Sequence, residues 1–141
     1  MSKKFLIVVS DYYKEISQGL YKGAIIVLDN ADIHHDVVYV PGALELPYTI
    51  LLHNALDKYD AFVALGCVIR GETYHFDIVA NESARGLMDL SLKHRLIIGN
   101  GIITAENEQQ AIERSSDYKN VGAAAAKAAL SLYELKKSIG L

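Results

Sequence analysis

The chain has 141 residues, of which 51% are hydrophobic and 22% are charged, and its formal net charge is -3. This length suits one domain with a single core, and the composition excludes a disordered or low-complexity chain. A general nucleic-acid-binding protein needs a basic surface, so the negative charge and the lack of a basic cluster argue against that class.

The cysteine content and the N-terminal sequence bear on the cellular compartment of the protein. Cys67 is the only cysteine in the chain, so no internal disulfide and no thiolate pair for a metal can form. The apolar run at residues 5–9 is too short for a signal peptide or a membrane span, and it ends in Ser10 and Asp11. We therefore expect a cytoplasmic protein.

The first half of the chain alternates short apolar runs with segments of helical periodicity. The β-branched run at 5–9 predicts a buried strand. A helix follows, with its apolar positions at Ile16, Leu20, Ala24, Val27 and Leu28. The run at 37–40 predicts a second strand that stops at Pro41-Gly42, and helical spacing resumes from Leu44 to Leu56.

The second half repeats the alternation. Residues 61–69 predict a third buried strand, and residues from about 75 to 93 predict a helix. A fourth strand is expected at 96–103, loosened by Gly99 and Gly101. Asn107 is placed to cap the next helix, with Gln110 reaching back to it in a capping box. An alanine-rich helix is expected at about 121–138.

Four strands that alternate with helices predict a parallel sheet, because parallel strands need crossover connections and the connecting helices then cover both faces. The predicted fold is a single doubly wound α/β domain spanning residues 1–141. Ligands bind such folds beyond the carboxyl ends of the strands. The loops that begin near Ser10, Pro41, Ile69 and Thr104 are therefore the candidate site.

The loop at 70–75 has the features of an anion site. It joins a strand end to a helix start, where free backbone N–H groups and the helix dipole favour a phosphate. Gly71 would allow close approach of the backbone to the anion, Thr73 adds a hydroxyl, and His75 adds an imidazole that can transfer protons. The lysine of a nucleotide-hydrolysing phosphate loop is missing. Taken alone, the loop favours the simpler interpretation, a helix N-terminus capped by Thr73 with a solvated histidine.

The other loops are ambiguous one at a time. Residues 41–47 allow close backbone approach, and Glu45 would accept hydrogen bonds from hydroxyl groups, yet acidic residues and proline also suit a helix start. Tyr12 and Tyr13 would stack on a planar heterocycle or simply anchor a helix. Arg114 would pair with phosphate or lie on the surface.

The paired histidines and the cysteine are not expected to be a metal site or a nucleophile. The adjacent His34 and His35 diverge and have no third ligand nearby in sequence, so we predict no metal site there. Cys67 lies inside an apolar strand, where burial disfavours a reactive thiolate, and we do not expect it to act as a nucleophile.

Together, these segments resemble the lumazine synthase family in order and spacing over nearly the whole chain. The most specific matches are Val40-Pro41-Gly42-Ala43-Leu44-Glu45-Leu46-Pro47, Leu65-Gly66-Cys67-Val68-Ile69-Arg70-Gly71-Glu72-Thr73-Tyr74-His75, and residues 104–114 from Thr104 to Arg114. The resemblance implies a flavodoxin-like fold. It also implies condensation of 5-amino-6-ribitylaminouracil with 3,4-dihydroxy-2-butanone 4-phosphate in riboflavin biosynthesis, without metal or organic cofactor.

The resemblance also implies roles for individual residues. His75 matches the catalytic proton-transfer residue. The uracil substrate and its ribityl chain would be held by Tyr12, Ala43, Leu44, Glu45, Cys67, Val68 and Ile69. The phosphate would be held by Glu72, Thr73 and Arg114.

The chain departs from the commonest family pattern at several of these positions. Tyr13 stands where asparagine is usual, and Glu72 and Tyr74 replace small residues of the phosphate loop. Glu72 places a carboxylate near a phosphate, which is repulsive unless its side chain points away. Asn100 occupies a ring-contacting position where phenylalanine is usual.

In the family, the site lies between neighbouring subunits of a pentamer, with the late arginine donated by the adjacent chain. We therefore expect a homo-oligomer built from pentamers, acting on small molecules, with no nucleic-acid or membrane partner. Two other interpretations remain: a flavodoxin-like module that binds a flavin or phosphate, and a shell or lumazine-binding homologue without catalysis.

Overall fold

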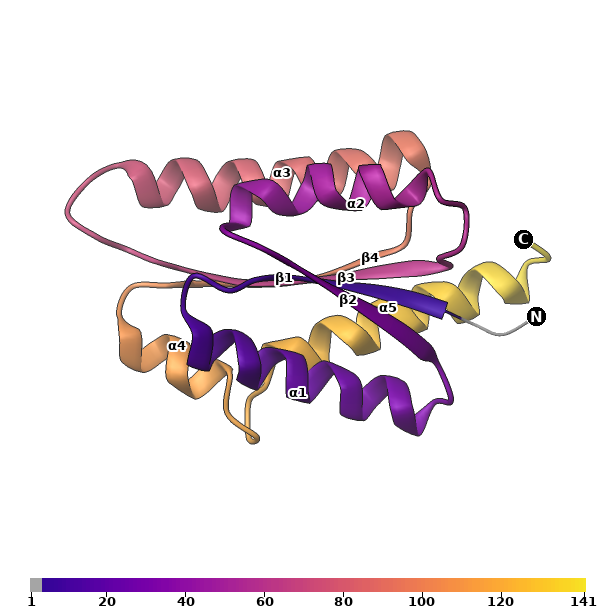
Figure 1. Ribbon diagram of the computed structural model, residues 1–141, viewed down its shortest axis with the longest axis horizontal. Helices are drawn as coiled ribbons and strands as arrows, with labels where there is room; N and C mark the ends of the chain where they lie inside the picture. Colours follow the sequence, from indigo (N-terminus) through magenta and orange to yellow (C-terminus); the bar gives the residue numbers. More distant parts are fainter. Residues whose placement is uncertain (1–3) are drawn as a thin grey trace.

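The computed structural model describes residues 4–141 and contains one sheet between two layers of helices (Figure 1). The four strands run in the order β2-β1-β3-β4, and every neighbouring pair is parallel. They are β1 (Lys4–Ser10), β2 (His34–Val40), β3 (Ala61–Ile69) and β4 (Ile98–Ala105). The predicted doubly wound α/β architecture is confirmed.

Helices cover both faces of this sheet. On one face lie α2 (Leu46–Asn54) and α3 (His75–His94); on the other lie α1 (Lys14–Asn30), α4 (Glu108–Arg114) and α5 (Val121–Ser138), as Figure 1 shows. A short 3-10 turn, η1 (Ala43–Glu45), precedes α2. Within residues 4–141, no helix is long and apolar enough to cross a membrane.

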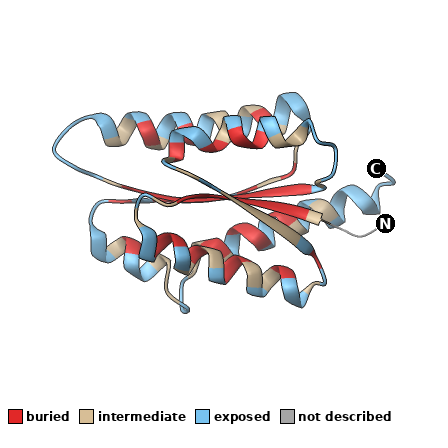
Figure 2. Cartoon of the chain, in the orientation of Figure 1, coloured by how far each residue is buried: buried red, intermediate tan, exposed pale blue. Residues whose placement is uncertain are grey.

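The two faces have separate cores, because neighbouring strand residues point to opposite sides. In β1, Phe5, Ile7 and Val9 pack towards α1 and α5, whereas Leu6 and Val8 pack towards α2 and α3. Both β1 and β3 are central strands, which explains their continuous apolar sequences. Figure 2 shows the buried residues concentrated in these strands and on the inner sides of the helices.

The glycines of β4 have a packing role that the sequence did not indicate. A Cβ atom on Gly99 would overlap the carbonyl oxygen of Ala125 in α5, and one on Gly101 would meet Leu65 and Ala125. These glycines therefore allow α5 to lie directly against the sheet. The same helix approaches α1 closely, because a Cβ on Gly122 would overlap the carbonyl oxygen of Leu20.

Asn120 joins these two helices. Its Oδ1 accepts from the N–H of Ala123 at 2.9 Å and so caps α5, while its Nδ2 donates to the carbonyl of Gly19 in α1 at 2.8 Å and to that of Ser115 at 3.2 Å. One half-buried side chain thus satisfies groups from three segments. Gly23 leaves room for it, since a Cβ there would overlap the amide.

We expect Asn120→Ala to lower the free energy of unfolding by about 2 kcal/mol, because a helix cap is lost and two carbonyls lose their donor. Asn107→Ala is the matched control, since Asn107 caps only α4 through one bond to Gln110 at 2.9 Å. Asn107→Ala should lower the free energy of unfolding by about 1 kcal/mol. Urea unfolding at a fixed protein concentration measures both, and equal losses would contradict the bridging role of Asn120.

Candidate active site

A cavity of about 400 Å³ lies at the carboxyl ends of the strands, where the first three loops meet. Nine of the predicted site residues line it: Tyr12, Ala43, Leu44, Glu45, Cys67, Val68, Ile69, Thr73 and His75. They come from segments far apart in the sequence and meet because parallel strands end at the same edge of the sheet. The site is therefore organised by the fold itself.

The first loop places two aromatic rings at the cavity. Tyr12 is 75% exposed, and its ring meets that of Tyr13 edge to face, with centroids 4.9 Å apart at an interplanar angle of 75°. Tyr13 is half-buried against the core. Burial, followed by the nearby Tyr12, raises the pKa of the Tyr13 hydroxyl, so this group stays neutral at neutral pH. The exposed Tyr12 ring is free to stack on a planar ligand.

The second loop differs from the predicted continuous helix. Residues 43–45 form the 3-10 turn, and Glu45 immediately precedes α2 instead of lying in its first turn. The turn is fixed by the buried Ala43 and by Thr49, whose hydroxyl donates to the carbonyl of Glu45 at 2.7 Å. The Glu45 side chain is exposed and lines the cavity, which leaves its carboxylate available to ligand hydroxyl groups.

The end of β3 forms the cavity wall with Cys67, Val68 and Ile69. Cys67 is only 7% exposed, and its burial raises the pKa of the thiol to about 12. The predicted burial of Cys67 is confirmed, and burial disfavours the thiolate form.

Alkylation of Cys67 in the folded protein should be at least about 100-fold slower at pH 8 than that of a free cysteine, because only the thiolate reacts. Below pH 12 its rate should rise about tenfold per pH unit, as the thiolate fraction does. Iodoacetamide labelling followed by mass spectrometry measures the rate. The urea-unfolded protein is the control, and equal rates in the two states would contradict the burial of the thiol.

The third loop leads into α3, which begins at His75 without a side-chain cap. The residue before the helix is Tyr74; the Thr73 hydroxyl contacts the N–H of His75 only at 3.4 Å, so capping by Thr73 is weak. The N–H group of His75, a residue that lines the cavity, therefore has only a weak acceptor within the described chain, which suits an anion site. His75 itself is exposed.

Gly71 lines the same cavity in open space, because nothing lies within 4 Å of a Cβ built on it. Phe76 and Val79, on the first turns of α3, also line the cavity and were not predicted. Helical spacing from His75 was the available signal, since Val79 lies one turn further along the same helix.

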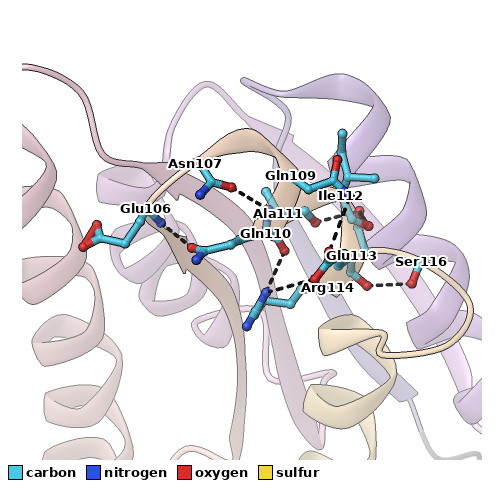
Figure 3. Close-up of polar contacts among 10 residues, drawn as sticks. Glu106, Asn107, Gln109, Gln110, Ala111, Ile112, Glu113, Arg114 and Ser116 are labelled. Carbon is cyan, nitrogen blue, oxygen red and sulfur yellow. Dashed lines mark hydrogen bonds and ion pairs between the residues drawn. The ribbon is translucent and has the colours of Figure 1, made fainter.

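The remaining predicted residues lie outside the cavity of the single chain. Arg114 is the last residue of α4 and is half-buried; its Nη1 donates to the carbonyl of Gln110 at 3.1 Å (Figure 3). Glu72 is exposed and does not line the cavity. Asn100 is exposed on β4, and its Oδ1 accepts from the N–H of Ile102 at 3.0 Å.

The start of α4 differs from the predicted capping box in one bond. Asn107 does accept from the N–H of Gln110, but the Gln110 side chain accepts from the N–H of Glu106 at 2.7 Å and not from that of Asn107 (Figure 3). The amide thus ties the end of β4 to the helix that carries Arg114. Among residues 4–141, no cluster of three or more potential metal ligands is found.

Comparison with known proteins places this chain in a family. A family model described as 6,7-dimethyl-8-ribityllumazine synthase matches residues 2–137. A protein of that name from Bartonella tribocorum is 55% identical over 96% of this chain and 91% of its own length. The namesakes from Zymomonas mobilis and Agrobacterium fabrum are 53% and 51% identical, covering 96% and 99% of this chain and 98% and 99% of their own. The chain belongs to the 6,7-dimethyl-8-ribityllumazine synthase family.

Proposed function

We propose that this protein, acting as one domain, condenses 5-amino-6-ribitylaminouracil with 3,4-dihydroxy-2-butanone 4-phosphate, giving 6,7-dimethyl-8-ribityllumazine, phosphate and water. The observation that carries the proposal is the convergence of nine residues of the family pattern on one cavity. Its stacking ring, exposed carboxylate and anion-binding helix start match the heterocycle, the ribityl hydroxyls and the phosphate of the two substrates.

The proposed roles of the uracil-binding residues come from the family resemblance, and their positions at the cavity support them. Tyr12 stacks on the pyrimidine ring, and Glu45 accepts hydrogen bonds from the ribityl chain beside Ala43 and Leu44. The strand end at residues 67–69 contacts the heterocycle through backbone groups. Asn100 would complete the uracil site from the neighbouring chain, because it lies outside the cavity of its own chain.

The chemistry demands orientation and proton transfer. The amine of the uracil substrate attacks the ketone, so the protein supplies no nucleophile. Holding both reactants in one cavity is worth about 7 to 11 kcal/mol in favourable geometries. His75 transfers protons during imine formation and phosphate loss, which adds about 10²- to 10⁴-fold.

The phosphate site is made by Thr73, by the start of α3 at His75 and by Arg114. The N–H groups and the dipole of α3 attract the anion, and Arg114 pairs with it and stabilises it as it leaves. Glu72 belongs to this loop, but its carboxylate lies outside the cavity, which limits its repulsion of the phosphate.

We propose a homo-oligomer built from pentamers, in which Arg114 enters the site of the neighbouring chain. Two observations support it: Arg114 does not line the cavity of its own chain, and apolar side chains are exposed along α2 and α3. The most exposed of these are Tyr48 at 67%, Leu52 at 54%, Met88 at 58% and Leu92 at 75%. An exposed apolar surface of this kind indicates contact with another protein chain. In a ring of identical subunits, the same contact would bury this surface on every chain. Analytical ultracentrifugation should give at least five times the 15.5 kDa mass of one chain.

We place the enzyme in the cytoplasm, where its single buried thiol is compatible with a reducing environment. It would work on small molecules, without metal or organic cofactor.

The function is tested by absorbance after purified protein is mixed with the two substrates. Lumazine chromophore formed well above a protein-free control would establish the synthase. An intact oligomer that binds the uracil substrate but forms no product would overturn the proposal in favour of a shell or binding homologue.

A further inference from the structure

Arg70 is the first residue of the candidate phosphate loop at 70–75, yet its side chain already binds two carboxylates. Its Nε donates to Glu106 Oε2 at 2.6 Å, while Nη1 and Nη2 donate to the two carboxylate oxygens of Asp77 at 3.1 and 3.3 Å. These bonds use three of the five N–H donors of the guanidinium, and the forked pair of donors on Nη1 and Nη2 is directed to Asp77. A phosphate that binds this forked pair would have to displace the Asp77 carboxylate.

The two carboxylates that Arg70 binds belong to different segments near the cavity. Asp77 lies in the first turn of α3, two residues after His75, and Glu106 directly follows β4. The Arg70 guanidinium also lies 4.4 Å from the centroid of the Phe76 ring, which lines the cavity. The Arg70 N–H donates to the carbonyl of Ala105 at 2.9 Å. One residue therefore ties the start of α3 to the ends of β3 and β4.

We propose that Arg70 is a positioning residue of the candidate active site, which fixes the first turn of α3, and with it His75 and Phe76, against the strand ends without binding phosphate. The contacts stand on their own, whereas the effect on catalysis rests on the proposed function. Misplacement of a reacting group by about 1 Å can cost about 100-fold in rate.

Charge alone would not give this effect. The Arg70 side chain is 40% exposed, and isolated surface ion pairs contribute little to stability. Two carboxylates on one guanidinium, with an aromatic ring beneath it, form a network with a defined geometry. The network holds the first turn of α3, which carries His75, through Asp77. Loss of the network should therefore alter the geometry of the site more than the overall stability of the protein.

The test uses Arg70→Met, Arg70→Lys, Asp77→Asn and the Arg70→Met/Asp77→Asn double variant. Their kcat and KM for the phosphate substrate are compared, with binding of inorganic phosphate measured by calorimetry. A positioning role predicts that Arg70→Met and Asp77→Asn each lower kcat about 10-fold or more, and that the double variant is little worse than either. Lysine should not restore the rate, since it cannot form the fork.

A ligand role predicts the opposite for Asp77→Asn. Removing that carboxylate would free Arg70, so phosphate would bind more tightly, while Arg70→Met would bind it less tightly and Arg70→Lys would largely recover. That pattern, additive losses, or an unchanged kcat in both single variants would overturn the proposal.

Arg85→Met is the matched control. Arg85 also binds two carboxylates on α3, those of Glu82 at 2.7 Å and Asp89 at 3.0 Å, but it does not line the cavity. Its kcat should equal that of the wild type.

Hydrogen exchange separates this proposal from the proposed function, because it needs no turnover. The N–H groups of Asp77 and Ile78 both donate to the carbonyl of Tyr74, at 3.0 and 3.3 Å. Their exchange should quicken about 10-fold in Arg70→Met and Asp77→Asn, and not in Arg85→Met. If the wild type makes no product, the proposed function fails, and exchange still decides the role of Arg70: unchanged rates would overturn it.

Discussion

Replacing His75 by alanine should lower kcat about 10²- to 10⁴-fold, the usual contribution of a positioned acid-base group. The expected mechanism is loss of proton transfer at the start of α3, where the imidazole lines the cavity. The KM for the uracil substrate should change little, because Tyr12 and Glu45, on other loops, remain in place. Steady-state formation of the lumazine chromophore by purified protein measures both constants.

The control for this variant is His94→Ala. His94 is exposed at the other end of the same helix and does not line the cavity, so its removal should leave kcat unchanged. Thermal denaturation of both variants would exclude a general loss of structure. Equal kcat values for His75→Ala and the wild type would disprove the proton-transfer role.

The sequence predicted the elements best where burial is unambiguous. The third strand and the last helix have the expected bounds, because one is a continuous apolar run and the other is rich in alanine. The fourth strand begins at Ile98, two residues later than expected. Leu96 and Ile97 are apolar, but they belong to the connection that follows Arg95, whose left-handed backbone (φ 56°) ends α3.

The sequence could predict the parts of the site whose positions the parallel sheet determines. Loops at the carboxyl ends of adjacent strands must meet, and for that reason residues from the first three loops share a cavity. The Arg70 network joins residues 7 and 36 positions apart through side-chain geometry, which periodicity does not report. Nor can periodicity indicate whether Arg114 serves its own chain or a neighbour, because that depends on assembly; only the family resemblance suggested a neighbour.

Mixed oligomers of two impaired variants should therefore recover activity. Arg114→Ala removes a charged hydrogen-bonding partner of the phosphate and is expected to weaken use of that substrate about 10- to 100-fold. His75→Ala disables a different group. If a site takes His75 from one chain and Arg114 from the next, co-refolding equal amounts of the two variants at random restores about a quarter of the sites in a ring of head-to-tail contacts.

Product formation before and after co-refolding measures this recovery. Co-refolding His75→Ala with His75→Gln is the control, since no arrangement of those chains contains an intact histidine. A site contained within one chain would gain nothing from mixing, because every chain then carries a defect in its own cavity. Recovery in the first mixture alone would thus establish that Arg114 crosses to a neighbouring subunit and would explain why it lies outside the cavity of its own chain.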